Sequence, residues 1–272
     1  MSNPSTVGGR IRDWRQRRRL TQLDLALDAE ISPKHLSFIE TGRSQPSRQM
    51  VLHLAEQLDV PLRERNALLI AGGFAPVYPE RPLDAPDLAA ARRAVDLILK
   101  GHEPYPALAV DRHWNLISAN AAAMAFLAVD ADLLAQPLNV LRLSLHPKGL
   151  APRIANLIEW RGHLLDRLRR QIDATADAAL QTLYDELKGY PAPPAAVGVP
   201  HGQDLGGVAV PMRLQTEHGV LAFISTVTVF GTPTDVTLSE LALETFFPAD
   251  DFTAKALISL AAERRQEGDA AA

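Results

Sequence analysis

The chain has 272 residues, of which 22% are charged, and a formal net charge of −4. This length allows two domains, each with its own core. The absence of cysteine excludes disulfides, thiolate metal sites and a cysteine nucleophile. Since no apolar run approaches the roughly 18 residues that span a bilayer, and residues 1–10 lack a signal-peptide core, we expect a cytoplasmic protein without membrane contact.

The charge is divided unevenly along the chain. Residues 1–74 carry 11 Lys/Arg and 8 Asp/Glu, whereas the remainder carries 17 and 24. Six arginines crowd into one short stretch: Arg10, Arg12, Arg15, Arg17, Arg18 and Arg19. They form either the solvated face of a surface helix or contacts to DNA phosphates, which supply most non-specific DNA affinity. The acidic remainder should be repelled by DNA and is expected to do something else.

Residues 21–46 have the pattern of a helix-turn-helix. Thr21 and Ser32 fit the N-caps of two short helices, and Pro33 occupies a first helical position, where no N–H is needed. Gly42 then ends the second helix. The expected core-facing residues are Leu23, Leu25, Ala26 and Leu27 in the first helix and Leu36 and Ile39 in the second. A second helix that presents polar side chains is suited to the DNA major groove.

Residues 7–74 resemble the lambda-repressor-like (Xre/Cro) helix-turn-helix family over its whole five-helix domain. The resemblance rests on T-Q-x-x-L-A at 21–26, I-S at 31–32 and L-S-x-I-E-x-G at 36–42. It implies that Gln22 anchors the protein on a phosphate and a neighbouring base. The DNA-binding residues that it implies are Gln22, Ser32, Pro33, Lys34, His35, Ser37, Phe38, Arg43, Ser44 and Ser47.

The side chains at these positions suggest how bases are read. Lys34 can donate to guanine O6 and N7, and Ser37 can pair with either kind of base. Phe38 departs from the polar residue common in the family, so we expect a thymine methyl contact or simple packing there. Candidate phosphate contacts after the reading helix are Arg43, Ser44 and Ser47. Proteins of this type usually bind paired half-sites as dimers, so a homodimer on double-stranded DNA is expected.

Residues 75–86 are rich in proline and predict an extended linker. The second domain, residues 87–266, is expected to contain a hairpin followed by Asn120 and a helix to Leu127. The other expected elements are helices at 87–101, 151–172, 173–187 and 252–265, a hairpin of 107–110 with 114–119, and strands at 208–214 and 219–230. On the first of these helices, Leu88, Ala91, Val95, Ile98 and Leu99 share one side. This order predicts an α+β fold with one antiparallel sheet partly covered by helices.

Three segments of the second domain, 106–127, 139–150 and 225–250, resemble the MmyB-like regulator ligand-binding domain, which is PAS-like. The resemblance covers roughly residues 104–260 and has that family's domain order. It implies a sensory domain fused to a DNA reader, found in bacteria and especially actinobacteria. A bound long-chain fatty acid is associated with the fold, so an acyl ligand is expected.

A PAS-like fold places an apolar pocket between its sheet and its helices. The candidate lining residues are Trp114, Ile117, Phe126, Leu141, Leu143, Trp160, Leu164, Phe223 and Phe230. For each of them ordinary core packing is the alternative. His146 and Arg153 could hold a ligand carboxylate, although His146 could instead cap the helix that follows it.

An enzyme is not expected. The eight histidines show no H-x-x-x-H or H-E-x-x-H spacing, and no G-x-S-x-G motif occurs, so neither a metal nor a cofactor other than an apolar ligand is indicated. Three hypotheses therefore stay open. The chain is a ligand-responsive transcription regulator, a DNA binder whose second domain only dimerises or docks a protein, or an antitoxin-like DNA binder with a protein partner.

Overall fold

The computed structural model describes residues 6–126, 131–191, 210–231 and 234–270. By its internal contacts the chain divides into two units. The first contains residues 1–81, 171–176 and 233–239, and the second contains residues 82–170, 177–232 and 240–272. Each unit is a separate structural body with its own core, as the length of the chain allows.

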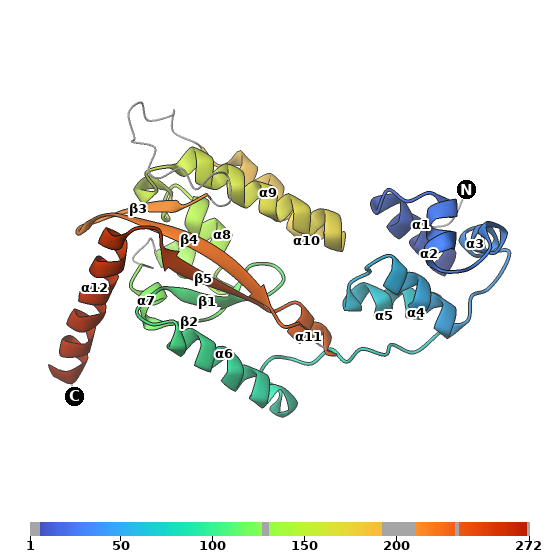
Figure 1. Cartoon of the computed structure of the whole chain (residues 1–272), viewed down its shortest axis with the longest axis horizontal. Helices are drawn as coiled ribbons and strands as arrows, with labels where there is room; N and C mark the ends of the chain where they lie inside the picture. The colour runs from blue at the N-terminus through green and yellow to red at the C-terminus, as the bar shows by residue number, and fades with distance from the viewer. Residues whose placement is uncertain (1–5, 127–130, 192–209, 232–233, 271–272) are drawn as a thin grey trace. The chain divides into compact units, whose positions relative to one another are not determined.

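The N-terminal part of the first unit consists of five short helices (Figure 1). They are α1 (Val7–Arg17), α2 (Gln22–Asp28), α3 (Pro33–Glu40), α4 (Arg48–Gln57) and α5 (Leu62–Ala71). The side chains of Thr6, Thr21, Ser32 and Ser47 each accept a backbone N–H at the start of one of the first four helices. The five-helix domain that the sequence predicts is confirmed.

The inward face of α2 differs from the expected one. Leu25 and Ala26 are fully buried, but Leu23 and Leu27 are 56% and 68% exposed. These two residues are four positions apart, so they share one face of the helix, and that face is the outer one. The expectation that all four apolar residues of α2 face the core was therefore wrong.

The rest of the described chain alternates helices with five strands (Figure 1). The helices are α6 (Ala89–Gly101), α7 (Ala121–Met124), α8 (Val140–Leu145), α9 (Leu157–Thr175), α10 (Ala178–Gly189), α11 (Val236–Ser239) and α12 (Asp251–Ala270). Short 3-10 turns occur at η1 (Pro86–Leu88), η2 (Ala131–Leu134) and η3 (Ala151–Arg153). The strands are β1 (Ala107–Val110), β2 (Leu116–Ala119), β3 (Met212–Thr216), β4 (Gly219–Val229) and β5 (Ala242–Pro248).

The five strands form one antiparallel sheet in the order β2-β1-β5-β4-β3. The last strand in sequence is therefore the central one: Glu244 of β5 pairs with Leu108 of β1 on one side and with Val227 of β4 on the other. The predicted α+β class is confirmed, whereas β5 itself was not anticipated.

Several element boundaries also differ from the predicted ones. The helix expected at 151–172 begins only at Leu157, because Ile154 forms an isolated bridge with Leu214. The helix expected at 173–187 begins at Ala178, after Ala176 adopts a positive φ and Asp177 caps the next turn. Ile98, expected on the buried side of α6, is 42% exposed. Leu127 and residues 208–209 lie outside the described residues.

The two faces of β5 have different roles. The side chain of Phe246 lines a cavity, whereas the next residue, Phe247, makes an edge-on contact with His102 at a ring distance of 4.8 Å. Because successive strand residues point to opposite faces, the end of α6 lies on the face away from the cavity. Within the described residues, no helix is long and apolar enough to cross a membrane.

Candidate functional site

The helix α3 presents the side chains that the sequence assigns to base reading. Pro33 and Lys34 are exposed, and His35, Ser37 and Phe38 are partly exposed. The buried residues of this helix are Leu36, Ile39 and Glu40. As expected, Leu36 and Ile39 face the core, so the outer face is left to the polar side chains and Phe38.

Two cations flank the ring of Phe38. The Lys34 Nζ lies 5.7 Å from the ring centroid, and the Arg43 Cζ lies 5.9 Å from it. Both distances are in the range of a cation–π interaction. The loop after α3 is also fastened here, because the backbone N–H groups of Arg43 and Ser44 both donate to the Phe38 carbonyl. Phe38 therefore connects Lys34 in α3 with Arg43 in the loop that follows α3.

The side chain of Gln22, at the first position of α2, is held by the buried ion pair of Arg15 with Glu40. Its Nε2 donates to Glu40 Oε2 at 2.7 Å. The same carboxylate accepts from Arg15 Nε at 2.7 Å and from Arg15 Nη2 at 2.9 Å, and the Arg15 Nη1 donates to the Leu20 carbonyl. The side chain of Glu40, in α3, is 1% exposed. This buried network therefore holds the side chain of Gln22, in α2, against the end of α3.

The arginine cluster is not one solvated face. Arg15 forms a buried ion pair with Glu40, and the Arg18 Nε donates to the Leu58 carbonyl at 2.8 Å. Arg17 and Arg19 are exposed. These two remain candidates for phosphate contacts, whereas Arg15 has a structural role.

The hydroxyls of Ser32 and Ser47 both have a local role as helix caps. The Ser32 Oγ accepts from the His35 N–H, and the Ser47 Oγ accepts from the Met50 N–H. Their exposed positions at helix starts still allow a phosphate to approach the helix N-terminus. The structure thus brings the expected DNA-binding residues to α3, the start of α2 and the loop up to α4.

The second unit contains a cavity of about 90 Å³ between the sheet and the helices α7, α8 and α9. All five strands contribute to its lining, with Leu108, Leu116, Met212, Phe223 and Phe246 among the contributors. Its walls are apolar except at Ser144, Arg167 and Glu244. The Ser144 Oγ accepts from the Trp160 Nε1 at 3.0 Å, so this hydroxyl already has a partner.

Six of the expected pocket residues line this cavity, and the others do not. The six are Phe126, Leu141, Leu143, Trp160, Leu164 and Phe223. Ile117 is 39% exposed, and Phe230 follows the end of β4 away from the lining. Trp114 is buried but lies behind Arg167 rather than on the wall. The expected wall was thus found in part, and its charged members were missed.

His146 and Arg153, the expected carboxylate ligands, lie outside the cavity. The His146 ring packs edge-on against Tyr190 at 5.0 Å, and its Nδ1 accepts from the Lys148 N–H. His146 is the C-cap residue of α8 rather than a cap of a following helix. The Arg153 Nε donates to the Gln215 carbonyl, and its side chain lines a separate surface groove.

Arg167 and Glu244 are the charged residues of the cavity wall. The Arg167 Nη1 donates to Glu244 Oε1 at 2.8 Å, and their side chains are 16% and 5% exposed. The guanidinium also stacks on the indole of Trp114, with 4.3 Å between Cζ and the ring centroid. A signal for Arg167 exists in the sequence, because it lies three residues after Leu164 and seven after Trp160, on the same helix face.

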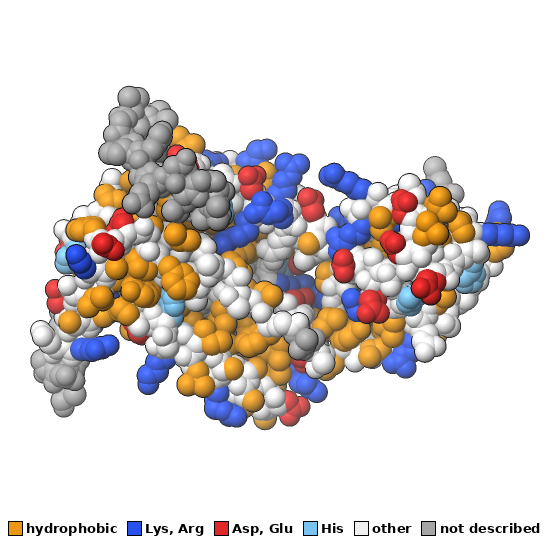
Figure 2. Space-filling model, viewed as in Figure 1, with side chains coloured by type: hydrophobic (Ala, Val, Ile, Leu, Met, Phe, Trp, Pro, Cys, Tyr) orange, Lys and Arg blue, Asp and Glu red, His pale blue; other side chains and the backbone are white. Residues whose placement is uncertain are grey.

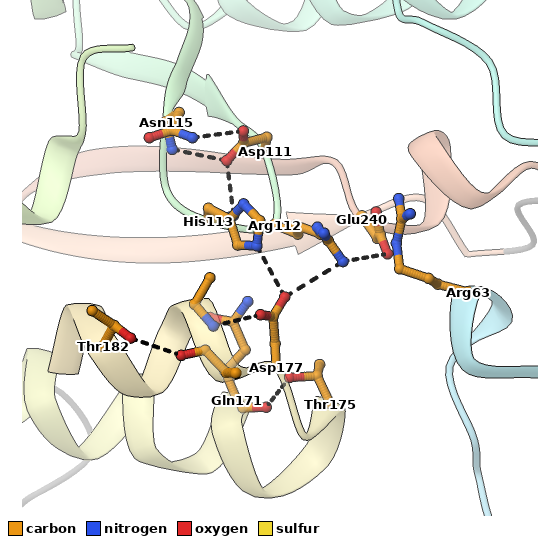
Figure 3. Close-up of polar contacts among 12 residues, drawn as sticks. Arg63, Asp111, Arg112, His113, Asn115, Gln171, Thr175, Asp177, Thr182 and Glu240 are labelled. Carbon is orange, nitrogen blue, oxygen red and sulfur yellow. Dashed lines mark hydrogen bonds and ion pairs between the residues drawn. The ribbon is translucent and has the colours of Figure 1, made fainter. Parts of the chain in front are cut away.

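The loop between β1 and β2 carries Trp114, and Figure 3 shows the polar contacts of its neighbours Asp111, His113 and Asn115. The Asp111 carboxylate accepts from the backbone N–H groups of His113 and Asn115 and from Asn115 Nδ2, all between 2.8 and 2.9 Å. These bonds hold a tight turn in which Trp114 has a φ of 67°. A left-handed conformation is unfavourable for a bulky residue, so the turn fixes a side-chain position that the chain would otherwise avoid.

Figure 3 also shows Asp177, which ties this loop to the start of α10. Its Oδ2 contacts His113 Nε2 at 2.9 Å and Arg112 Nη1 at 3.4 Å, while Oδ1 accepts the Ala179 N–H. Burial favours the protonated acid, but these hydrogen bonds and charges outweigh it and hold the pKa of Asp177 below its ordinary value. The carboxylate is therefore ionised and holds the loop that carries Trp114.

His163 is close to the charged end of the cavity wall and stacks on Trp160 at 5.5 Å. Burial, followed by the nearby charges of Arg167 and Arg170, lowers the pKa of His163. The imidazole is consequently neutral near pH 7, and Arg167 is the cation of the cavity wall. Within the described residues, no group of three or more His, Asp or Glu side chains could hold a metal ion.

A five-helix unit with a polar reading helix, joined to an α+β unit with an apolar cavity, defines a DNA-binding regulator with a sensor-type second domain. Residues 11–65 match the helix-turn-helix family, and residues 91–260 match the MmyB-like transcription regulator ligand binding domain. The second match covers more than half of the chain, so the chain belongs to the MmyB-like transcription regulators. It is a DNA-binding transcription regulator with a ligand-binding domain. A comparison with curated proteins gave no match.

Proposed function

We propose that the cavity of the second unit binds a small apolar ligand of the fatty-acid type, and that its occupancy controls DNA binding without any catalysed reaction. The observation that supports this proposal is the cavity wall, which is apolar apart from Ser144, Arg167 and Glu244. Ligand sites typically combine such walls with a few polar groups that fix orientation.

Control of DNA binding requires that the ligand binds one arrangement of the protein better than another. The cavity lies between the sheet and α8 and α9, so a ligand longer than the cavity pushes these helices away from the strands. A ligand with equal affinity for both arrangements would shift nothing, however tightly it bound. The regulatory signal is therefore the movement that widens the cavity.

We also propose that the protein binds DNA as a homodimer. One reading helix covers too few base pairs for specificity, and proteins of this class pair their half-sites about one helical turn apart. Leu97 and Ile98 on α6 are 71% and 42% exposed, and Figure 2 shows hydrophobic side chains gathered over this helix. An apolar face of this kind is suited to the same face of a second copy.

Sedimentation tests the dimer. The wild-type chain and an Asp96→Lys control, exposed on α6 but turned away from Leu97 and Ile98, should sediment as dimers, and Leu97→Glu as a monomer. A wild-type monomer at micromolar concentration, with and without DNA, would contradict the proposal.

Native mass spectrometry of freshly purified protein, followed by denaturing extraction, tests the ligand. We expect an extra mass in the range of a fatty acid that denaturation releases. Ala123→Leu should lose this mass because Ala123 lies on the cavity wall, whereas Ala121→Leu on the exposed side of α7 should keep it. A clean mass without ligand, together with a tightly protected second unit, would instead favour a dimerisation or docking module.

A further inference from the structure

The guanidinium of Arg167 is incompletely bonded within the cavity wall. Among the described residues, only its Nη1 has a hydrogen-bond partner, the Oε1 of Glu244. Its Nε and Nη2 are buried and have no partner among the described residues. Nearly all buried polar groups in proteins are hydrogen-bonded, so two unpartnered donors on one cation call for an explanation.

The contacts that Arg167 does make hold it in one orientation. Trp114 covers one face of the guanidinium at 4.3 Å, and Glu244, on the central strand, holds one corner. Trp114 is itself fixed by the turn at Asp111. The guanidinium is thus held in place by Trp114 and Glu244, whereas its Nε–Nη2 edge has no hydrogen-bond partner among the described residues. Binding residues are typically held in this way, with their rotamers locked by packing and by hydrogen bonds from supporting residues.

We propose that the Nε–Nη2 edge of Arg167 binds a carboxylate at the end of the apolar ligand, and that Trp114 and Glu244 act as positioning residues. Two parallel N–H donors match the two oxygens of a carboxylate, and Arg is the residue best suited to this bidentate geometry. The inference rests on the proposed function, because it assigns the polar end of the same ligand. It replaces His146 and Arg153, which lie outside the cavity.

The negative charge of Glu244 should weaken the binding of a ligand carboxylate to Arg167. Glu244 already offsets the charge of Arg167, so a ligand carboxylate brings a second anion to the same guanidinium. Replacing Glu244 by Gln removes that competition while keeping a hydrogen-bond acceptor for Nη1. The Glu244→Gln variant should therefore bind an acid more tightly than the wild type and an ester equally well.

The test compares decanoic acid with methyl decanoate, using full-length protein freed of bound lipid on a hydrophobic resin. Isothermal titration calorimetry should show the acid binding to the wild type about tenfold or more tightly than the ester. Arg167→Gln should remove this preference and still bind the ester. Arg169→Gln, on the exposed side of the same helix, is the matched control and should keep the preference.

The outcomes separate this inference from the proposed function. Equal binding of acid and ester by wild type and Arg167→Gln, or loss of the preference in Arg153→Gln instead, overturns the role of Arg167 and leaves the apolar ligand standing. No binding of either probe overturns the proposed function itself. If Arg167→Gln does not fold, the double variant Arg167→Met with Glu244→Gln leaves no buried charge unpaired and should bind the ester without a preference for the acid.

Discussion

Arg15 in α1 and Glu40 at the end of α3 form a bidentate ion pair inside the helix-turn-helix unit, with N–O distances of 2.7 and 2.9 Å. The pair joins the first helix to the reading helix. Because Gln22 donates to the same carboxylate, the pair also sets the position of the expected DNA anchor. The packing of α1 on α3 and the position of Gln22 therefore depend on one buried carboxylate.

Removal of one partner of this pair should be costly. Arg15→Met leaves Glu40 buried and unpaired, and we expect a loss of about 3–5 kcal/mol in the free energy of unfolding. Arg17→Met, an exposed position on the same helix, should stay within about 0.5 kcal/mol of the wild type. Urea unfolding monitored by circular dichroism measures both. Similar stabilities for the two variants would show that the pair contributes no more than a surface contact.

Lys34→Ala should relax the preference for one base pair at a cost of about 1–3 kcal/mol. Arg43→Ala, a candidate phosphate contact, should weaken binding uniformly and lower the slope of the salt dependence by about 1. Fluorescence anisotropy on a selected operator and on random DNA, at several salt concentrations, distinguishes the two. An equal loss on both DNAs for Lys34→Ala would identify Lys34 as a phosphate contact only.

Substitution by alanine should have opposite effects on stability at Gly8 and Gly162. A Cβ on Gly8 would lie 2.0 Å from the Ile39 carbonyl oxygen, where α1 approaches α3, whereas a Cβ on Gly162 in α9 meets nothing within 4 Å. Gly8→Ala should destabilise the first unit by about 1–3 kcal/mol. Gly162→Ala should stabilise the second by about 0.5–1 kcal/mol. Differential scanning calorimetry of the two variants checks the sign of each change.

Tyr190 should ionise late when the pH is raised. Burial, together with the hydrogen bond that its hydroxyl donates to Glu186, raises the pKa of Tyr190 to about 12. The unfolded chain loses this proton near pH 10, so the resulting stability is present below about pH 10 and lost as the pH rises towards 12. Ultraviolet titration should show a late tyrosinate phase that Tyr190→Phe removes. An unchanged titration curve in that variant would contradict this prediction.

The helices of the first unit were predictable because their signals are local. Each cap at Thr21, Ser32 and Ser47 is a side chain that bonds a backbone N–H three residues later. The direction of Leu23 and Leu27 was not predictable in the same way, because it depends on which neighbouring helices cover α2. Periodicity identifies a helix more reliably than it identifies the side that is buried.

The charged members of the cavity wall were harder to predict from the sequence, for a related reason. Arg167 lies in a helix rich in arginine, where the ordinary expectation is a solvated side chain. Glu244 lies in β5, whose residues do not alternate cleanly because a central strand is covered on both faces. Only the pairing of β5 with β1 and β4 shows that Glu244 is inside. The apolar residues Trp160, Leu164 and Phe223 needed no such information.

The late position of β5 in the chain has a consequence for synthesis on the ribosome. The hairpin of β1 and β2 emerges long before β3 and β4, and the strand that joins the two hairpins is Ala242–Pro248, near the C-terminus. The sheet therefore cannot close co-translationally until residues 242–248 have been made. The five DNA-binding helices are joined by contacts of shorter sequence separation, such as that of Arg15 with Glu40, and should fold faster. A message truncated before residue 242 would encode all five DNA-binding helices but not the strand that joins β1 to β4.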